Sequence, residues 1–158
     1  EKPCGYVDVP IANEEDSADV FGNRARGTDI EGGTLSAEGY ADVARQLTER
    51  FGLTAAAITL RESVSASVNG WSGMLYTGGQ AYLSTKYNIH IVDRVGGGDS
   101  FGAGLIYSLL EGKAPQDAIE FAVAASCLKH TVEGDCNIAT AAEVESLVRN
   151  GGSGRVQR

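Results

Sequence analysis

The sequence predicts an α/β fold, and three observations lead to that prediction. Apolar residues recur at helical spacing between Ser36 and Phe51, as on the buried face of an amphipathic helix. Residues 55–60 form a continuous apolar run, which is typical of a strand covered on both faces. A short apolar stretch, 89–92, leads through glycines into a second helical pattern. Strands and helices that follow one another in this way form layered α/β domains.

The first half of the chain predicts a strand and two helices. Residues 6–12 form a short strand that contains a proline, and Asn13 is placed to cap a helix that ends at Gly22. A polar, glycine-rich stretch at 23–35 is expected to be a surface loop. Ser36 then caps the second helix, which Gly52 ends.

The second half predicts hairpins and then three helices. Between Val64 and Val92 the apolar period changes to two, with turns expected at Gly70 and at 78–79. One helix follows the glycines and stops at Gly112, and the next has Pro115 in its first turn. Thr140 and Glu143 have the spacing of a capping box for a last helix at 141–148, and 151–158 is a polar tail.

Composition limits the possible functions. The chain has 158 residues, a formal net charge of −8 and 42% hydrophobic residues, enough for one domain with a core. The acidic balance argues against a nucleic-acid partner, and no apolar run approaches the roughly 20 residues of a membrane span. The first residues resemble neither a signal peptide nor a transit peptide.

The three cysteines predict reduced thiols and a cytoplasmic location. Their odd number does not suit a disulfide framework, and no secretion signal accompanies them. Cys127 and His130, with Cys136 nearby, offer an alternative zinc site, but no Cys-x-x-Cys pair supports it. Buried thiols are the better interpretation.

A glycine turn is the strongest functional signal. The strand at 89–92 is followed by Gly96, Gly97, Gly98 and Asp99, and then by a helix. Free amides at a helix start bind anions such as phosphate. The Walker A loop is excluded because Ala103 stands where lysine is required, and the dinucleotide fingerprint because Phe101 stands at its third glycine. Asp99 is placed to act as a general base for a hydroxyl that attacks phosphorus. The alternative is a plain tight turn in which Asp99 only caps the helix.

The residues around this turn resemble a known family. Asp93-x-x-Gly-x-Gly-Asp-x-Phe is similar to the signature of the ribokinase (PfkB) sugar kinases. Thr59-Leu60-Arg61 resembles the family's Thr-Leu-Gly strand end, with arginine in place of glycine. The segments 128–131, 133–137 and 154–158 look like the bacterial 2-keto-3-deoxygluconate kinase branch. The resemblance runs over most of residues 6–158 and implies a ribokinase-like three-layer α/β/α sandwich.

The resemblance also implies a reaction and a set of site residues. ATP, with Mg²⁺ as cofactor, would phosphorylate the terminal 6-hydroxyl of the sugar acid, with Asp99 as base and the amides of Gly96, Gly97 and Gly98 as anion hole. The implied nucleotide-binding residues are Thr59, Leu60, Arg61, Ser63, Val64, Gly96, Gly98 and Val123. Asp135 would contact the sugar together with Asp99, and Asn13 and Asp16 would hold Mg²⁺ through water. Asp93 would belong to a cation-binding loop. A surface ion pair for Arg61 and a solvated loop acid for Asp135 remain alternatives.

By the same resemblance, residues 1–158 are the C-terminal nucleotide-binding and catalytic part of a longer kinase, without its N-terminal half and lid. The remaining alternatives are another sugar kinase of the family, such as a fructokinase or ribokinase, or a catalytically silent nucleotide-binding fragment. A sheet edge left without its neighbouring strands would favour self-association, so a homo-oligomer is possible. The reading frame upstream of Glu1 is the cheapest observation that separates these possibilities.

Overall fold

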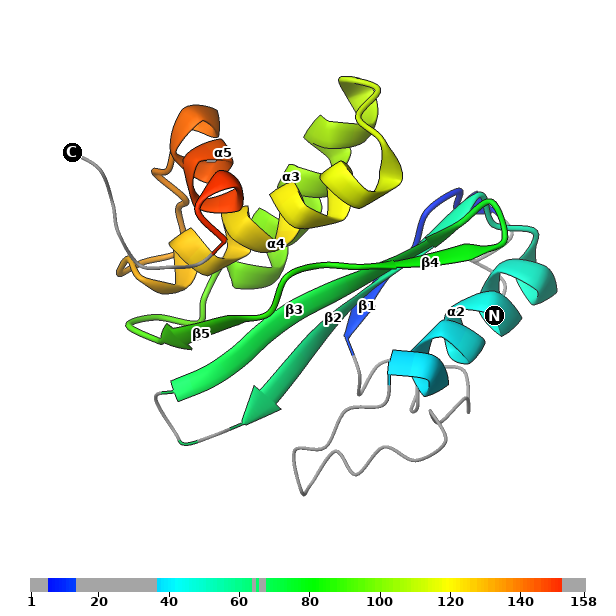
Figure 1. The fold of residues 1–158 in the computed structure, drawn as a ribbon, viewed down its shortest axis with the longest axis horizontal. Helices are drawn as coiled ribbons and strands as arrows, with labels where there is room; N and C mark the ends of the chain where they lie inside the picture. The colour runs from blue at the N-terminus through cyan, green and yellow to red at the C-terminus, as the bar shows by residue number, and fades with distance from the viewer. Residues whose placement is uncertain (1–5, 14–36, 64, 66–67, 152–158) are drawn as a thin grey trace.

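The computed structural model describes residues 6–13, 37–63, 65 and 68–151, which form one sheet with helices on both faces (Figure 1). Helix α2 covers one face, and helices α3, α4 and α5 cover the other (Figure 1). The predicted α/β class and the three-layer arrangement are therefore confirmed. The helix expected after Asn13 lies outside the described residues.

The sheet is mixed and has five strands in the described part of the chain. Its strands are β1 (Ile11–Asn13), β2 (Ala55–Ser63), β3 (Val68–Thr77), β4 (Gln80–Leu83) and β5 (Tyr87–His90). β1 runs parallel to β2, and β3 runs antiparallel to β2, β4 and β5. Strand β1 is shorter than the predicted strand at 6–12, and β2 continues to Ser63 beyond the apolar run.

One predicted turn is confirmed and the other is wrong. Gly78 and Gly79 both have positive φ, 58° and 82°, and connect β3 to β4, as a two-residue hairpin requires. Gly70 instead lies inside β3, paired with Glu62 of β2. A Cβ at Gly70 would lie 3.2 Å from Glu62 Cβ and 3.3 Å from Lys86 Cδ. This glycine therefore marks close packing in a strand, not a reversal of the chain.

Strands β4 and β5 lie end to end along one edge of β3. Ser84 connects them: its amide donates to the Gly73 carbonyl at 2.9 Å, and its hydroxyl accepts from the Gly73 amide at 3.0 Å. The serine thus continues the strand pairing across the break.

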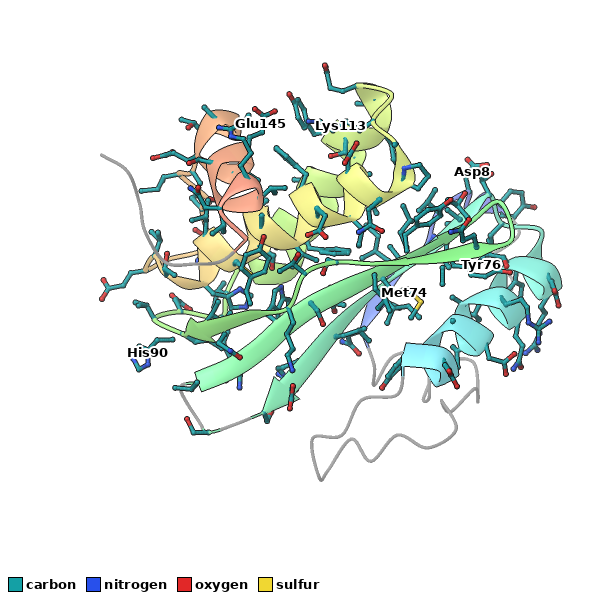
Figure 2. The ribbon with its side chains drawn as sticks, in the orientation of Figure 1. Asp8, Met74, Tyr76, His90, Lys113 and Glu145 are labelled. Carbon is teal, nitrogen blue, oxygen red and sulfur yellow. The ribbon has the colours of Figure 1, made fainter. Side chains whose placement is uncertain are left out.

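Helix α2 (Ala37–Phe51) buries its apolar stripe against the sheet, as the sequence predicts. Tyr40, Val43, Ala44 and Leu47 pack in one cluster with the β2 and β3 residues Ala56, Ile58, Leu60 and Met74. Figure 2 shows Met74 and Tyr76 on the α2 side of the sheet. Gly52 follows the helix with φ 66°, the left-handed conformation that ends many helices.

Helices α3 (Gly97–Leu110) and α4 (Pro115–His130) pack closely on the opposite face. A Cβ at Gly104 of α3 would lie 3.0 Å from Ala122 Cα, and a Cβ at Gly73 would lie 2.8 Å from Val123 Cγ2. Small residues at these contacts let α3 approach α4 and let α4 approach β3. In the described part of the chain no helix is long and apolar enough to span a membrane.

Helix α5 (Ala141–Arg149) begins with the predicted capping box. Thr140 Oγ1 accepts from the Glu143 amide at 3.3 Å, and the Thr140 amide donates to Glu143 Oε2 at 2.8 Å. Lys113, before α4, forms an ion pair with Glu145 of α5 at 3.4 Å (Figure 2).

Replacing Thr140 with alanine is expected to lower the free energy of unfolding by about 1 kcal/mol, because the Glu143 amide at the start of α5 loses its acceptor. Urea unfolding of the purified chain measures this change. Glu143→Gln keeps an acceptor for the Thr140 amide and serves as the matched control. An equal loss in both variants would contradict a contribution from the threonine hydroxyl.

Candidate active site

The glycine turn has the geometry of an anion site. Gly96 is the N-cap of α3 with φ 78° and ψ −2°, and no side chain caps the helix. The Gly97 amide donates to the Arg94 carbonyl at 3.2 Å, whereas the amides of Gly98 and Asp99 have no hydrogen-bond partner among the described residues. Both residues are exposed. Unpaired amides at the positive end of a helix are suited to bind an anion.

Asp99 does not cap the helix, so this structure does not support the alternative of a plain capped turn. It lies in the first turn of α3, as its third residue, with its side chain exposed. Asp99 and Asp135 line the same open groove, of about 410 Å³, between α3, α4 and α5. The other lining residues are Ser100, Ala103, Gly104, Tyr107, Phe121, Ala125, Asn137, Ala139, Ala141 and Val144. The structure therefore brings together the two carboxylates that were assigned to the sugar.

Asp93 and the loop after α4 fix the shape of the turn. Asp93 Oδ1 accepts from the Val95 amide at 3.0 Å, and its Oδ2 accepts from the Gly134 amide at 2.9 Å. These amides, together with the charge of Lys129, hold the pKa of Asp93 below its usual value. A Cβ at Gly96 would collide with the Asp135 carbonyl oxygen. The 131–135 loop and the turn are thus in direct contact.

His130 supports the turn from inside the fold. Its Nδ1 lies 2.7 Å from the Ser126 carbonyl, an acceptor, so Nδ1 carries the proton. A Cβ at Gly97 would lie 2.5 Å from His130 Cε1, and the imidazole ring packs against Trp71 with 4.7 Å between centroids. Ser126 Oγ also donates to the Gly97 carbonyl at 2.8 Å. Glycine at 97 is therefore required by the close approach of the histidine.

The pKa of His130 is lowered, first because the ring is buried and also because Arg94, Lys129 and Arg61 are positive. The unfolded chain then takes up a proton at this position at higher pH than the folded chain. We expect the free energy of unfolding to fall as pH drops below about 6.5, the unperturbed value for histidine. Denaturant unfolding between about pH 7 and pH 5 measures the slope. His90 is exposed and points away from the sheet (Figure 2), so His90→Gln is the control that keeps the slope. A His130→Gln variant with the same slope would contradict the assignment.

The remaining predicted site residues fall into two groups. Thr59 and Arg61 share a face of β2 with Ala57, which packs on the α3–α4 side. Arg61 pairs with Trp71, and its charge acts on His130, so it lies on the side of the glycine turn. Asn13 pairs with Thr59 at the carboxyl end of β1, and Ser63 is exposed at the end of β2.

The structure does not bring two of the predicted nucleotide residues to this surface. The Leu60 side chain is buried in the α2 cluster, on the opposite face of the sheet. Val123 is 0% exposed and packs against Gly73 in the core between α4 and β3. Its burial excludes side-chain contact with a ligand in this structure. Val64 and Asp16 lie outside the described residues.

The described residues contain no group of three or more His, Cys, Asp or Glu side chains that could hold a metal ion. Cys127 is a buried free thiol and Cys136 an exposed one. Mg²⁺ prefers oxygen ligands, needs one or two from the protein and takes the rest from phosphates and water. The amide oxygen of Asn13, at a strand end beside Thr59, fits that requirement.

Sequence reasoning missed the supporting residues Trp71, Lys129 and His130 and the contact of Arg94 with Asn69, whose Oδ1 accepts from Arg94 Nη2 at 3.0 Å. A signal for two of them was present. Ile119, Ala122, Val123 and Ser126 lie on one side of α4, and the same helical spacing continues to 129 and 130, which are buried as well. Polar residues on a buried stripe next to a glycine turn are candidates for support of that turn.

The fold and this site define a class of protein, the ribokinase-like sugar kinases. Over 94% of this chain and 44% of the other, the structure superposes on 2-dehydro-3-deoxygluconokinase from Thermotoga maritima with a TM-score of 0.87 and 47% identity. Ribokinase from Arabidopsis thaliana, solved with ribose and ATP, shares the fold with a TM-score of 0.67 at 20% identity, over 92% of this chain and 42% of the other.

The sequence comparison gives the family. Residues 5–142 match the pfkB family carbohydrate kinases, and the chain belongs to that family. It is also 34% identical over 77 residues to 2-dehydro-3-deoxygalactonokinase from Haloferax volcanii, a match that covers 49% of this chain and 24% of that protein. The chain thus spans less than half the length of the relatives it matches.

Proposed function

We propose that this chain carries the catalytic part of an ATP-dependent kinase that phosphorylates 2-keto-3-deoxygluconate on its 6-hydroxyl. The observation that carries the proposal is that Asp99, at the end of the glycine turn, lines one open groove together with Asp135, whose carbonyl contacts Gly96. The 47% identity to a 2-dehydro-3-deoxygluconokinase supports the choice of acceptor.

In this mechanism the oxygen of the sugar 6-hydroxyl attacks the γ-phosphorus of ATP while Asp99 accepts the hydroxyl proton. The bond from the γ-phosphorus to the β-phosphate oxygen breaks, and ADP leaves. The exposed Asp99 side chain is accessible from the groove, where Asp135 orients the sugar by accepting hydrogen bonds from its hydroxyls. The unpaired amides of Gly98 and Asp99 stabilise the charge on the transferring phosphoryl group, whereas the Gly97 amide is bonded to the Arg94 carbonyl. Phosphoryl transfer depends mainly on such positioning and electrostatics.

The nucleotide is proposed to lie along the end of β2. Thr59, Arg61 and Ser63 would contact it there through their side chains, and Leu60 through its backbone. Val64, which lies outside the described residues, belongs to the same proposed set. Arg61 would add charge near the phosphates. Asn13, with Asp16, would hold Mg²⁺ through water, and the ion would neutralise phosphate charge. The free thiols suit a cytoplasmic location.

ADP release with MgATP and a panel of sugars tests the acceptor. We expect turnover with 2-keto-3-deoxygluconate well above that with 2-keto-3-deoxygalactonate, fructose or ribose. A preference for another sugar would assign the chain to a different kinase of the family. Calorimetry with MgATP tests the second candidate, a nucleotide-binding fragment without activity. Binding without turnover on any sugar would support that candidate, and no binding at all would overturn both.

A further inference from the structure

Lys129 is a buried cation that the mechanism above does not use. It lies in the last turn of α4 and is 0% exposed. Its Nζ donates to the Val132 carbonyl at 3.0 Å, and its Cε would lie 3.2 Å from a Cβ on Gly96. The lysine side chain thus fills the space between the end of α4, the following loop and the glycine turn. Burial of an ammonium group is costly unless other groups compensate its charge.

Asp93 is the carboxylate that interacts with this charge. Lys129 lies against Gly96, three residues along the chain from Asp93, and its positive charge contributes to the lowered pKa of Asp93, after the hydrogen bonds from the Val95 and Gly134 amides. The same carboxylate accepts hydrogen bonds from the Val95 amide, just before the turn, and from the Gly134 amide, in the loop after α4. Lys129, Asp93 and the 131–135 loop therefore pack together next to Gly96.

We propose that Lys129 is a positioning residue that holds the phosphate-binding turn and cancels the charge of Asp93 beside it. The inference rests on the proposed function, and it adds the Lys129 ammonium group to the residues that support the phosphate-binding turn. Asp93 stands six residues before Asp99 on the same turn, where an uncompensated carboxylate would repel a polyphosphate. Lys129 removes that repulsion from inside the fold, so the exposed side of the turn presents its amides to the ligand.

A simpler role is that Lys129 only neutralises the negative end of α4. That role concerns stability and has no consequence specific to the turn. Replacing a buried ion by an apolar side chain of similar size often leaves stability unchanged or raises it. The two roles therefore differ in what a neutral variant does to phosphate binding.

The test is a double-mutant cycle on MgATP binding by calorimetry with Lys129→Met, Asp93→Asn and the double variant. We expect Lys129→Met to weaken MgATP binding about tenfold, or about 1.4 kcal/mol. Adding Asp93→Asn should restore most of that loss, because both charges are then removed. Lys113→Met, which removes a lysine at the far end of α4, is the matched control and should bind as wild type. Additive effects in the cycle, or unchanged binding in Lys129→Met, would overturn the proposal.

Amide hydrogen exchange without ligand provides a readout that does not depend on kinase function. In Lys129→Met we expect faster exchange at Val95, Gly97 and Gly134, whose amides are hydrogen-bonded in the turn and loop. Exchange in the β3–β4 hairpin should not change. Faster exchange throughout the chain would show a general loss of stability and would overturn the positioning role. If the wild-type chain bound no MgATP, the proposed function would fail while this measurement still decided the role of Lys129.

A Lys129→Gln variant separates charge from hydrogen bonding. Glutamine retains a donor that can reach toward the Val132 carbonyl, but it has no charge. We expect it to resemble Lys129→Met in MgATP affinity. Wild-type affinity in Lys129→Gln would contradict the charge argument.

Discussion

Asp99→Asn is expected to lower phosphoryl transfer by about 10²- to 10⁴-fold, the usual contribution of a general base. Asparagine has nearly the same shape but cannot take the proton from the attacking hydroxyl. The Asp99 side chain is exposed and makes no cap contact, so the fold does not depend on its charge. ADP release at saturating sugar and MgATP measures the loss.

MgATP affinity is the control for this variant. Calorimetry should give a dissociation constant within a few-fold of wild type, or a tighter one, since a negative charge beside the phosphates has been removed. Asp117→Asn, in the first turn of α4, makes the same chemical change at a second helix start and should leave turnover intact. Near-normal turnover in Asp99→Asn would reject Asp99 as the base.

Gly96→Ala is expected to be the most damaging single substitution in the turn. Its φ of 78° is unfavourable for alanine, and the new methyl group would collide with the Asp135 carbonyl oxygen. Backbone strain and overpacking together predict a loss of about 2–4 kcal/mol in the free energy of unfolding. MgATP binding should weaken as well, because the collision separates the turn from the 131–135 loop. Urea unfolding and calorimetry measure the two effects.

Gly98→Ala is the matched control for stability. Gly98 lies two residues along the same turn, has no atom within 4 Å of a Cβ position and does not have positive φ. Alanine in a helical turn is favoured over glycine by about 0.5–1 kcal/mol, so this variant should be at least as stable as wild type. Equal destabilisation by the two substitutions would show that the contact between Gly96 and Asp135 does not stabilise the turn.

The order of elements and the turn itself could be predicted from local signals. Patterns among neighbouring residues predict three features that the structure has. They are the covered strand at 55–60, the apolar stripe of α2 and the Thr140–Glu143 capping box. Gly70 was misassigned because a glycine in a strand and a glycine in a turn look alike without the partner strand. What distinguishes them is the contact with Glu62 and Lys86, which only the folded sheet creates.

The residues that support the site were not predicted, because they act through contacts between segments that are distant in the sequence. His130 meets Gly97, and Lys129 meets Gly96, across more than thirty positions of sequence. Val123 shows the opposite limit: the resemblance placed it at the nucleotide, while its position on the buried stripe of α4 places it in the core. Spacing along one helix predicts which side is buried, but it does not predict what is buried beside it.

The tether between Ser126 and the Gly97 carbonyl, together with the close contact of Gly104 with Ala122, has a thermodynamic consequence. Helices α3 and α4 are fixed to each other at the first residue of α3 and again near the middle of both helices, so the amides of the turn are held in place before a ligand arrives. Binding then requires little ordering of the backbone. A loose glycine loop would lose conformational entropy when it binds, whereas this turn loses that entropy when the protein folds. A series of polyphosphates should accordingly bind with small differences in backbone order and with affinities that follow their charge.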